Sequence, residues 1–276
     1  MSSTLYYNGT VITVDPGVPD GTALLVRDGK IQAVGEYQAL LALRDRGTKL
    51  VNLEGKTILP GFVDAHSHIT MAKLFPHFSP PPVGEIDSIP KLVEAARQEL
   101  DAHPPKKGKW FVGMGYDNAY FPDSRHPTRH DLDAISATVP IALIHVSAHV
   151  GVLNTLALKE AGITADSAVE GGVIHKDPAT GEPTGLLEER ALTGLLGGKA
   201  AMPSFSAILR SVREAQDLYA QNGITTAQDG AANPSTKTLY RALGLLGGMK
   251  IDVYAYMLID GGRKGLLTFH SSFLLE

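Results

Sequence analysis

Residues 59–69 read Leu-Pro-Gly-Phe-Val-Asp-Ala-His-Ser-His-Ile, and the rest of the chain is best interpreted outward from this stretch. Its apolar first half predicts a buried strand that ends in polar residues. Asp64, His66 and His68 follow at every second position, so their side chains would share one face of a strand. Two neutral imidazoles on one face can bind a single divalent metal. Since a His-x-His pair also arises by chance, the flanking sequence decides how much weight the pair carries.

The segment before this stretch predicts short strands joined by tight turns. Within residues 4–57, turn signals occur at Asn8-Gly9, Asp28-Gly29 and Glu54-Gly55, each between runs rich in apolar residues. We expect hairpins at the first two signals, strands on both sides of the third, and a short helix over residues 37–44. A generic β-meander would give the same hairpins, but it would not account for the His-x-His motif that follows.

From residue 61 the pattern changes to strands that alternate with helical stretches, which is typical of a β/α architecture. Strands of the barrel type are expected at residues 61–66, 141–147, 224–228 and 251–258. Helical periodicity predicts helices over residues 90–103, 205–222 and 235–246. A hairpin is expected within residues 169–185, followed by a helix that begins at Leu186.

The composition is that of an ordinary globular protein without a basic surplus. The 276 residues are 43% hydrophobic and carry a net charge of −4, which gives no reason to expect nucleic acid or an anionic membrane as a partner. There is no cysteine, so a metal site would have to use histidine, carboxylates or a modified lysine. The N-terminus lacks a basic region followed by an apolar run, and no apolar run approaches ~18 residues. We therefore expect no signal peptide, no membrane span and a cytoplasmic location.

Several spaced motifs resemble one family of enzymes. Residues 58–68 resemble the first barrel strand of the amidohydrolase superfamily, whose members are metal-dependent hydrolases. The branch called amidohydrolase family 3 is matched by a Trp-led strand that ends in Gly-x-Asp, by a Leu-Asp pair, by a Ser-x-His and by an Asn-x-x-Ala-Leu helix start. These motifs lie at residues 110–117, 132–133, 147–149 and 154–158.

This resemblance implies an α/β fold with two parts. A small N-terminal β-sandwich would occupy residues 1–58, and the first part of a TIM-type (β/α)8 barrel would occupy residues 59–276. We identify about four of the eight strands that a closed barrel needs. The chain is therefore expected to resemble the N-terminal half of a family 3 member, with an incomplete barrel.

The resemblance also implies a candidate site. His66 and His68 would bind a divalent metal, with zinc as the first candidate, and Asp64 would orient one of the two rings. The catalytic residue stays unassigned, because the final aspartate of the superfamily has no counterpart here. The candidates for the pocket wall are His149, Glu189 and Asp229.

The pocket candidates have structural alternatives. Glu189 and its neighbour Glu188 would also suit the start of a helix, and we expect Glu188 to be solvated. Asp229 would also suit a turn at the end of a strand. His145 and His149 would lie roughly 13 Å apart on one extended strand, too far to share a metal. We expect His145 to be a core histidine with its hydrogen bonds satisfied.

The expected function is metal-dependent hydrolysis of a non-peptide C–N bond in a small amide-type substrate. The later ligands of the superfamily, a lysine or acid, two single histidines and a final aspartate, are not found, and His270 lies in a tail unlike a family strand. The alternative is a catalytically inactive, truncated fragment that lacks those ligands. An incomplete barrel would also expose an edge strand and favour self-association. A Rossmann-type enzyme is disfavoured, since no Gly-x-Gly-x-x-Gly follows a strand.

Overall fold

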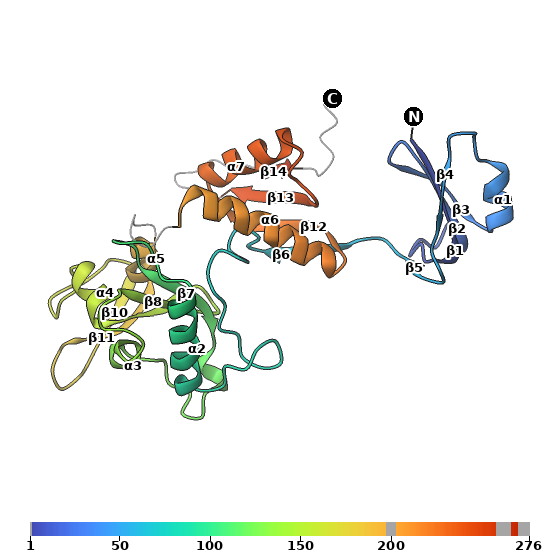
Figure 1. Ribbon diagram of the computed structural model, residues 1–276. Helices are drawn as coiled ribbons and strands as arrows, with labels where there is room; N and C mark the ends of the chain where they lie inside the picture. The colour runs from blue at the N-terminus through green and yellow to red at the C-terminus, as the bar shows by residue number, and fades with distance from the viewer. Residues whose placement is uncertain (1, 197–202, 258–265, 270–276) are drawn as a thin grey trace. The chain divides into compact units, whose positions relative to one another are not determined.

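The computed structural model describes residues 2–196, 203–257 and 266–269 (Figure 1). The chain divides into two compact units. The first unit comprises Met1–Ala65 with Tyr219–Ala227, and the second comprises His66–Leu218 with Gln228–Glu276. In the part of the chain that is described, every helix falls short of the length and hydrophobicity that a membrane crossing requires. The predicted domain boundary at residue 58 stays a prediction.

The N-terminal segment forms a sheet of five strands with the order β3-β2-β1-β4, in which β5 also pairs with β1. The first three strands pair in antiparallel fashion, whereas β4 and β5 run parallel to β1. The side chains of Leu5, Ala23, Leu25 and Leu40 form the small core, the last contributed by a short helix. The elements are β1 (Ser3–Val11), β2 (Gly21–Arg27), β3 (Lys30–Gly35), α1 (Tyr37–Ala42), β4 (Lys49–Asn52) and β5 (Thr57–Ile58).

Two of the three turn predictions are confirmed and one is wrong. Asp28 and Gly29 take positive φ angles of 47° and 76° and join β2 to β3, and Glu54-Gly55 joins β4 to β5. Asn8-Gly9, however, lies inside β1. A Cβ on Gly9 would lie 2.3 Å from the carbonyl oxygen of Lys56. The pair therefore forms an irregularity in β1 that lets the backbone pass close to the β4–β5 turn, and it does not form a hairpin.

In a second sheet, with the order β10-β11-β9-β8-β7, the strands β7 and β8 are buried on both faces. On β8, Ile141 and Leu143 belong to the core that contains helix α2 (Ile89–Ala102), whereas Ala142 and Ile144 belong to the core that contains helix α4 (Thr155–Glu160). A strand covered on both faces reads as a continuous apolar run. The strands are β7 (Phe111–Tyr116), β8 (Ile141–His145), β9 (Val150–Leu153), β10 (Gly172–Lys176) and β11 (Pro183–Glu189).

The helices of this region are α2 (Ile89–Ala102), α3 (Arg129–Asp133), α4 (Thr155–Glu160) and α5 (Arg190–Leu196), with a 3-10 turn η1 at Asn118–Tyr120. The predicted helix over residues 90–103 is confirmed as α2, and the hairpin predicted within residues 169–185 is confirmed by the antiparallel pairing of β10 with β11.

Two element boundaries in this region were predicted wrongly. The strand expected over residues 141–147 ends at His145, because the chain turns back into the antiparallel strand β9. Ala148 adopts a positive φ of 61° in this turn. The helix expected to begin at Leu186 begins at Arg190, because the preceding residues continue β11 and pair with β9.

A third sheet has the order β14-β13-β12-β6. Of the four strands expected in a barrel, three lie in this sheet, and the fourth is β8 of the second sheet. The prediction that the strand before Asp64 is buried is wrong: Phe62 is 55% exposed and Val63 is 70% exposed. Among the described residues, β6 is also an edge strand of its sheet. The elements are β6 (Phe62–Ser67), α6 (Phe205–Gln221), β12 (Ile224–Ala232), α7 (Pro234–Leu245), β13 (Asp252–Met257) and β14 (Leu266–Phe269). The predicted helices over residues 205–222 and 235–246 are confirmed as α6 and α7.

Candidate metal centre

His66 and His68 lie close together at the end of β6. Their ring centroids are 5.2 Å apart and their planes cross at 83°. Zinc–nitrogen bonds are about 2.0–2.1 Å long, so two imidazoles on one tetrahedral ion have centroids roughly 5 Å apart. Both residues are exposed, which leaves the rings accessible to an ion. The geometry of this pair therefore fits two ligands of one metal.

The strand that carries the pair is fixed from its other face. Ser67 lies between the two histidines, and its hydroxyl donates a hydrogen bond of 2.8 Å to the carbonyl oxygen of Gln228 on β12. Ile69, directly after the motif, is fully buried. Alternation along the strand thus directs Ser67 to a neighbouring strand while His66 and His68 share the opposite face.

Gly230 makes room for His66, and the sequence reasoning missed it. A Cβ on this glycine would lie 2.7 Å from Cε1 of His66 and 3.2 Å from Nδ1. Real Cβ atoms do not approach another heavy atom so closely, so a side chain at this position would displace the imidazole. The Asp-Gly pair at the end of the strand 224–230 was the available signal, since glycine inside a strand often marks a close approach.

The residues that the structure describes do not complete a metal site. Among them, no group of three histidine, cysteine, aspartate or glutamate side chains converges on one point. Catalytic zinc sites use three protein ligands and a water. His66 and His68 thus fit a divalent metal as a pair. His270 lies outside the described residues, and the orienting role of Asp64, two residues before His66 on β6, stays a prediction.

Asp229 is a buried residue of β12, with an exposed fraction of 1%. Its Oδ2 accepts a hydrogen bond of 2.6 Å from the hydroxyl of Tyr240, a residue of α7 that the sequence reasoning missed. This bond fixes the carboxylate against α7. The predicted place of Asp229 in a pocket wall stays a prediction.

His149 and Glu189 were predicted separately, and the structure brings them together. The antiparallel pairing of β9 with β11 places the two residues side by side, and the Glu189 amide donates to the carbonyl oxygen of His149. Nδ1 of His149 lies 3.1 Å from a carboxylate oxygen of Glu189. Both side chains are exposed. A pairing of residues 40 positions apart has no local sequence signal.

The expectation for His145 needs correction, whereas that for Glu188 is not contradicted. The side chain of Glu188 is 36% exposed, and its carboxylate lies 2.6 Å from Nε2 of His175 on the adjacent strand β10. His145 was expected to have its hydrogen bonds satisfied. Its Nδ1 contacts Ser147, but its buried Nε2 has no hydrogen-bond partner in the described part of the structure.

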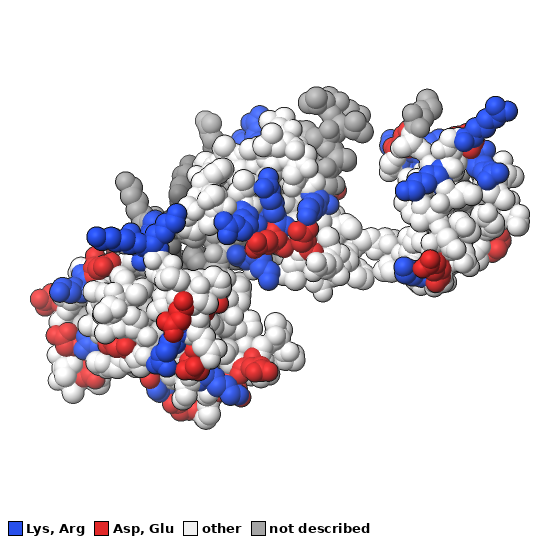
Figure 2. Space-filling view, in the orientation of Figure 1, with Lys and Arg blue, Asp and Glu red and all other residues white. Residues whose placement is uncertain are grey.

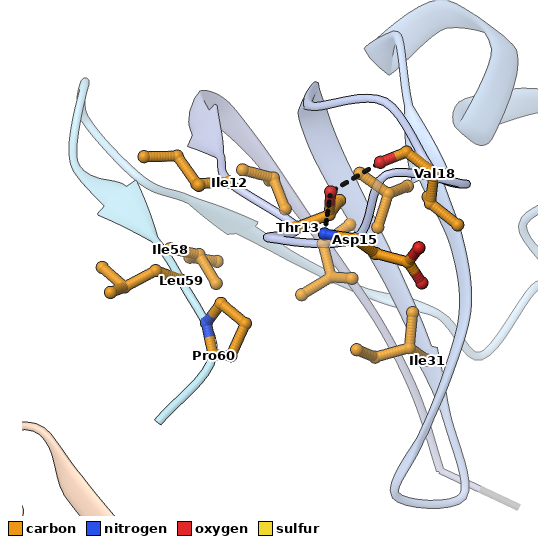
Figure 3. Close-up of a pocket in the computed structure, with 11 residues that line it drawn as sticks. Ile12, Thr13, Asp15, Val18, Ile31, Ile58, Leu59 and Pro60 are labelled. Atoms are coloured by element: carbon orange, nitrogen blue, oxygen red, sulfur yellow. Dashed lines mark hydrogen bonds between the residues drawn. The ribbon is translucent and has the colours of Figure 1, made fainter. Parts of the chain in front are cut away.

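A cavity of about 260 Å³ in the N-terminal unit is unsuited to metal chemistry (Figure 3). Its wall is almost entirely apolar, and Asp15 is the titratable residue that lines it. The hydroxyl of Thr13 donates to the carbonyl oxygen of Val18 and accepts from the amide of Asp15, so the polar groups at this rim bind one another. On the face of the molecule shown in Figure 2, acidic and basic residues are interspersed.

The chain is similar in sequence to several known proteins. Residues 49–263 match the sequence model described as "Amidohydrolase family". The chain is 29% identical over 256 residues to an N-substituted formamide deformylase of Arthrobacter pascens, an alignment that covers 90% of this chain and 46% of that protein. It is 28% identical to the putative amidohydrolase YtcJ of Bacillus subtilis, covering 94% of this chain and 46% of YtcJ.

The fold is similar to that of a solved, uncharacterized metal-dependent hydrolase from Pyrococcus furiosus. The TM-score is 0.64 at 21% identity, and the match covers 92% of this chain and 50% of the solved one. The chain thus spans about half the length of these relatives. Since the family model matches more than three quarters of its residues, from 49 to 263, the chain belongs to the amidohydrolase family.

Proposed function

We propose that this chain contributes to a metal-dependent hydrolase that cleaves a non-peptide C–N bond in a small amide-type substrate. The observation that carries the proposal is the His66–His68 pair, with ring centroids 5.2 Å apart and with Gly230 leaving space for His66. The family and the deformylase named above support the bond type. The proposed architecture is the first part of a (β/α)8 barrel over residues 59–276, preceded by a small β domain over residues 1–58.

His66 and His68 would hold a divalent ion, with zinc as the candidate, which would supply Lewis-acid chemistry when bound. Ser67 fixes their strand through the bond to Gln228. Asp64 would set the orientation of one imidazole, as carboxylates behind metal-binding histidines do.

His149 and Glu189 would form a proton-accepting pair on the pocket wall. With the Glu189 carboxylate 3.1 Å from Nδ1, the ring proton is held at Nδ1. The lone pair of the neutral ring then lies on Nε2, where His149 can accept a proton. Hydrolysis of the amide adds the hydroxyl of water to the carbonyl carbon and returns its remaining proton to the leaving amine.

The alternative is a catalytically inactive chain that lacks the later metal ligands. The observation in its favour is that the described residues supply no third ligand beside His66 and His68. We also propose self-association through the edge strand β6, on which Phe62 and Val63 are exposed.

Elemental analysis of the purified chain, together with its mass in solution and its rate of hydrolysis of small N-substituted formamides, tests these proposals. We expect near-stoichiometric metal and hydrolysis that chelation removes. The double variant His66→Ala/His68→Ala should lose both. The control variant His103→Ala/His130→Ala changes two exposed histidines on other elements and should retain both. Hydrolysis by a metal-free preparation would refute the metal-dependent function, whereas absence of metal and of hydrolysis would support the inactive alternative.

A further inference from the structure

A hollow of about 390 Å³ in the N-terminal unit is lined by the loop between α1 and β4 and by the start of β4. The lining residues are Arg44, Asp45, Arg46, Thr48 and Leu50, none of which lines the apolar cavity described above. Pockets for small molecules commonly have volumes of about 300–1,000 Å³. The hollow is therefore large enough for a small organic ligand, and its charged groups determine which kind of ligand fits.

The loop has a fixed shape because Asp45 and Thr48 bond to each other. The amide of Asp45 donates a hydrogen bond of 3.1 Å to the Thr48 hydroxyl, and this hydroxyl donates one of 2.9 Å to the Asp45 carboxylate. The amide of Gly47 donates to the same carboxylate oxygen at 3.0 Å. The Thr48 hydroxyl also lies 3.0 Å from that of Ser3 on β1. A ligand would thus meet a backbone that is already ordered, which lowers the entropic cost of binding.

The negative charge of Asp45 is offset by a third arginine. Nη2 of Arg27 on β2 lies 3.8 Å from Oδ2 of Asp45, and it donates a hydrogen bond of 3.2 Å to the carbonyl oxygen of Leu43. The bond from the Thr48 hydroxyl lowers the pKa of Asp45, and the Gly47 amide and the charge of Arg27 lower it further. Asp45 is therefore ionised at neutral pH, and its charge balances that of Arg27.

The charges of Arg44 and Arg46 are not balanced in this way. Both residues are exposed, and neither guanidinium has an ion pair or a hydrogen bond among the residues that the structure describes. Arg125 shows what a guanidinium does when an acceptor is near, since its two terminal nitrogens donate bonds of 2.8 and 3.2 Å to the two oxygens of Asp131. Phosphate oxygens accept the same paired bonds. The hollow therefore suits a ligand group with two negative charges.

A small phosphomonoester meets these requirements. Its second pKa is about 6, so at pH 8 it carries two negative charges and offers three acceptor oxygens. A free phosphate would leave most of the hollow unfilled and Leu50, which is 40% exposed, uncovered. We propose that Arg44 and Arg46 form a binding site for a small phosphomonoester, whose phosphoryl oxygens accept from both guanidiniums and whose organic part covers Leu50. This site needs no metal and is separate from the proposed hydrolase function.

Binding of phenyl phosphate to the full chain tests the site. The amide resonances of Gly47 and Thr48 would be followed by NMR at pH 8 and low ionic strength, because salt screens exposed charges. We expect phenyl phosphate to shift both resonances saturably. Phenyl sulfate, which has the same shape but one negative charge fewer, should bind at least about fivefold more weakly. Inorganic phosphate should also bind more weakly, because it makes no contact with Leu50.

Substitutions separate recognition by guanidinium groups from general attraction of charge. Arg44→Gln and Arg46→Gln should each weaken the binding of phenyl phosphate at least about threefold. The double variant Arg44→Lys/Arg46→Lys keeps both charges, but it should also bind about threefold more weakly, because an ammonium group cannot form the paired bonds. Lys49→Gln removes a charge from an exposed residue that does not line the hollow, and it should bind like the wild type.

The absence of a saturable shift, equal binding of phenyl phosphate and phenyl sulfate, or equal effects of Lys49→Gln and the two glutamine variants would each overturn the proposed site. Wild-type affinity in the lysine double variant would overturn recognition by guanidinium groups. Inorganic phosphate that binds as tightly as phenyl phosphate would assign the hollow to free phosphate and overturn the ester. Saturable binding of phenyl phosphate by a chain without hydrolase activity would support the site while the proposed function fails.

Discussion

The imidazole of His66 depends on the absence of a side chain at Gly230. The space for a methyl group is already filled by the ring, since a Cβ would lie 2.7 Å from Cε1. At another glycine a side chain can be accommodated, since a Cβ on Gly194 of α5 would meet nothing within 4 Å. This contrast gives a matched pair of substitutions.

We expect Gly230→Ala to weaken metal binding at least about tenfold, because the new methyl group displaces one of the two imidazoles. Isothermal titration with zinc would measure the affinity. Gly194→Ala should bind zinc like the wild type. Equal zinc affinity in the two variants would show that His66 does not contribute to a metal site.

At the scale of single elements, the side chain of Asn154 forms more hydrogen bonds than the capping of a helix requires. It is fully buried and caps α4 by accepting from the amide of Ala157. It also accepts from the amide of Ile141 at the start of β8 and donates to the carbonyl oxygens of Ser136 and Val139. One side chain therefore joins a helix, a strand and a loop.

Asn154→Ala should lower the free energy of unfolding by about 2–4 kcal/mol, because it leaves several buried polar groups without partners. Asn233, the exposed N-cap of α7, accepts only from the amides of Ser235 and Thr236 among the bonds seen. Asn233→Ala should cost about 1 kcal/mol. Urea unfolding measures both values, and equal losses would contradict the wider role of Asn154.

The contribution of the N-terminal end of α3 to the stability of the fold should decrease at acidic pH. Burial opposes ionisation of Asp131, but bonds from Arg125 and from the amide and hydroxyl of Thr128 outweigh it and hold its pKa below the usual value of 3.8. A carboxyl whose pKa is depressed by folding stabilises the folded state above its unfolded pKa of about 3.9. That contribution is lost as the pH falls through the folded pKa.

Asp131→Asn should therefore cost about 1–2 kcal/mol at pH 7, and the difference from the wild type should shrink below about pH 3.9. Thermal unfolding from pH 7 to pH 3 would follow this change. Asp166→Asn, at an exposed turn residue, should differ little from the wild type at any pH. A pH-independent cost would mean that the charge of Asp131 does not contribute.

Local sequence patterns predicted some elements well. They failed where contacts between segments far apart in sequence determine the structure. The 3.6-residue periodicity of residues 90–103 was sufficient for α2, whose Leu92, Ala96 and Leu100 are buried. The apolar run of residues 141–147 could not reveal that the chain turns after His145, since apolar residues continue through β9. The His149–Glu189 contact and the fit of Gly230 against His66 depend on pairing between distant strands, so no local pattern identifies the partner in either case.

At the scale of the whole molecule, the exposed edge of β6 should affect the mass in solution. β6 ends the order of its sheet, and both Phe62 and Val63 are exposed on it. Unpaired strand edges with apolar side chains favour association between copies.

We expect the mass measured by light scattering to rise with protein concentration, and Val63→Glu to reduce this rise because a charge on an edge strand opposes pairing. Val83→Glu, at an exposed position in the loop before α2, serves as the control. A mass that does not change with concentration, or an equal effect of both variants, would rule out association through β6.

The parallel pairing of β4 and β5 with β1 has a consequence for the order in which the N-terminal segment is assembled. β1 bonds to β2 on one edge, but its other edge receives Lys49–Asn52 and then Thr57–Ile58. β1 therefore keeps this edge open until Lys49–Asn52 has been synthesised. Contacts so distant in sequence close late. The small sheet is thus expected to form in two kinetic steps, a fast β1–β2–β3 meander and a slower closure by the segment that leads directly into the His-x-His strand.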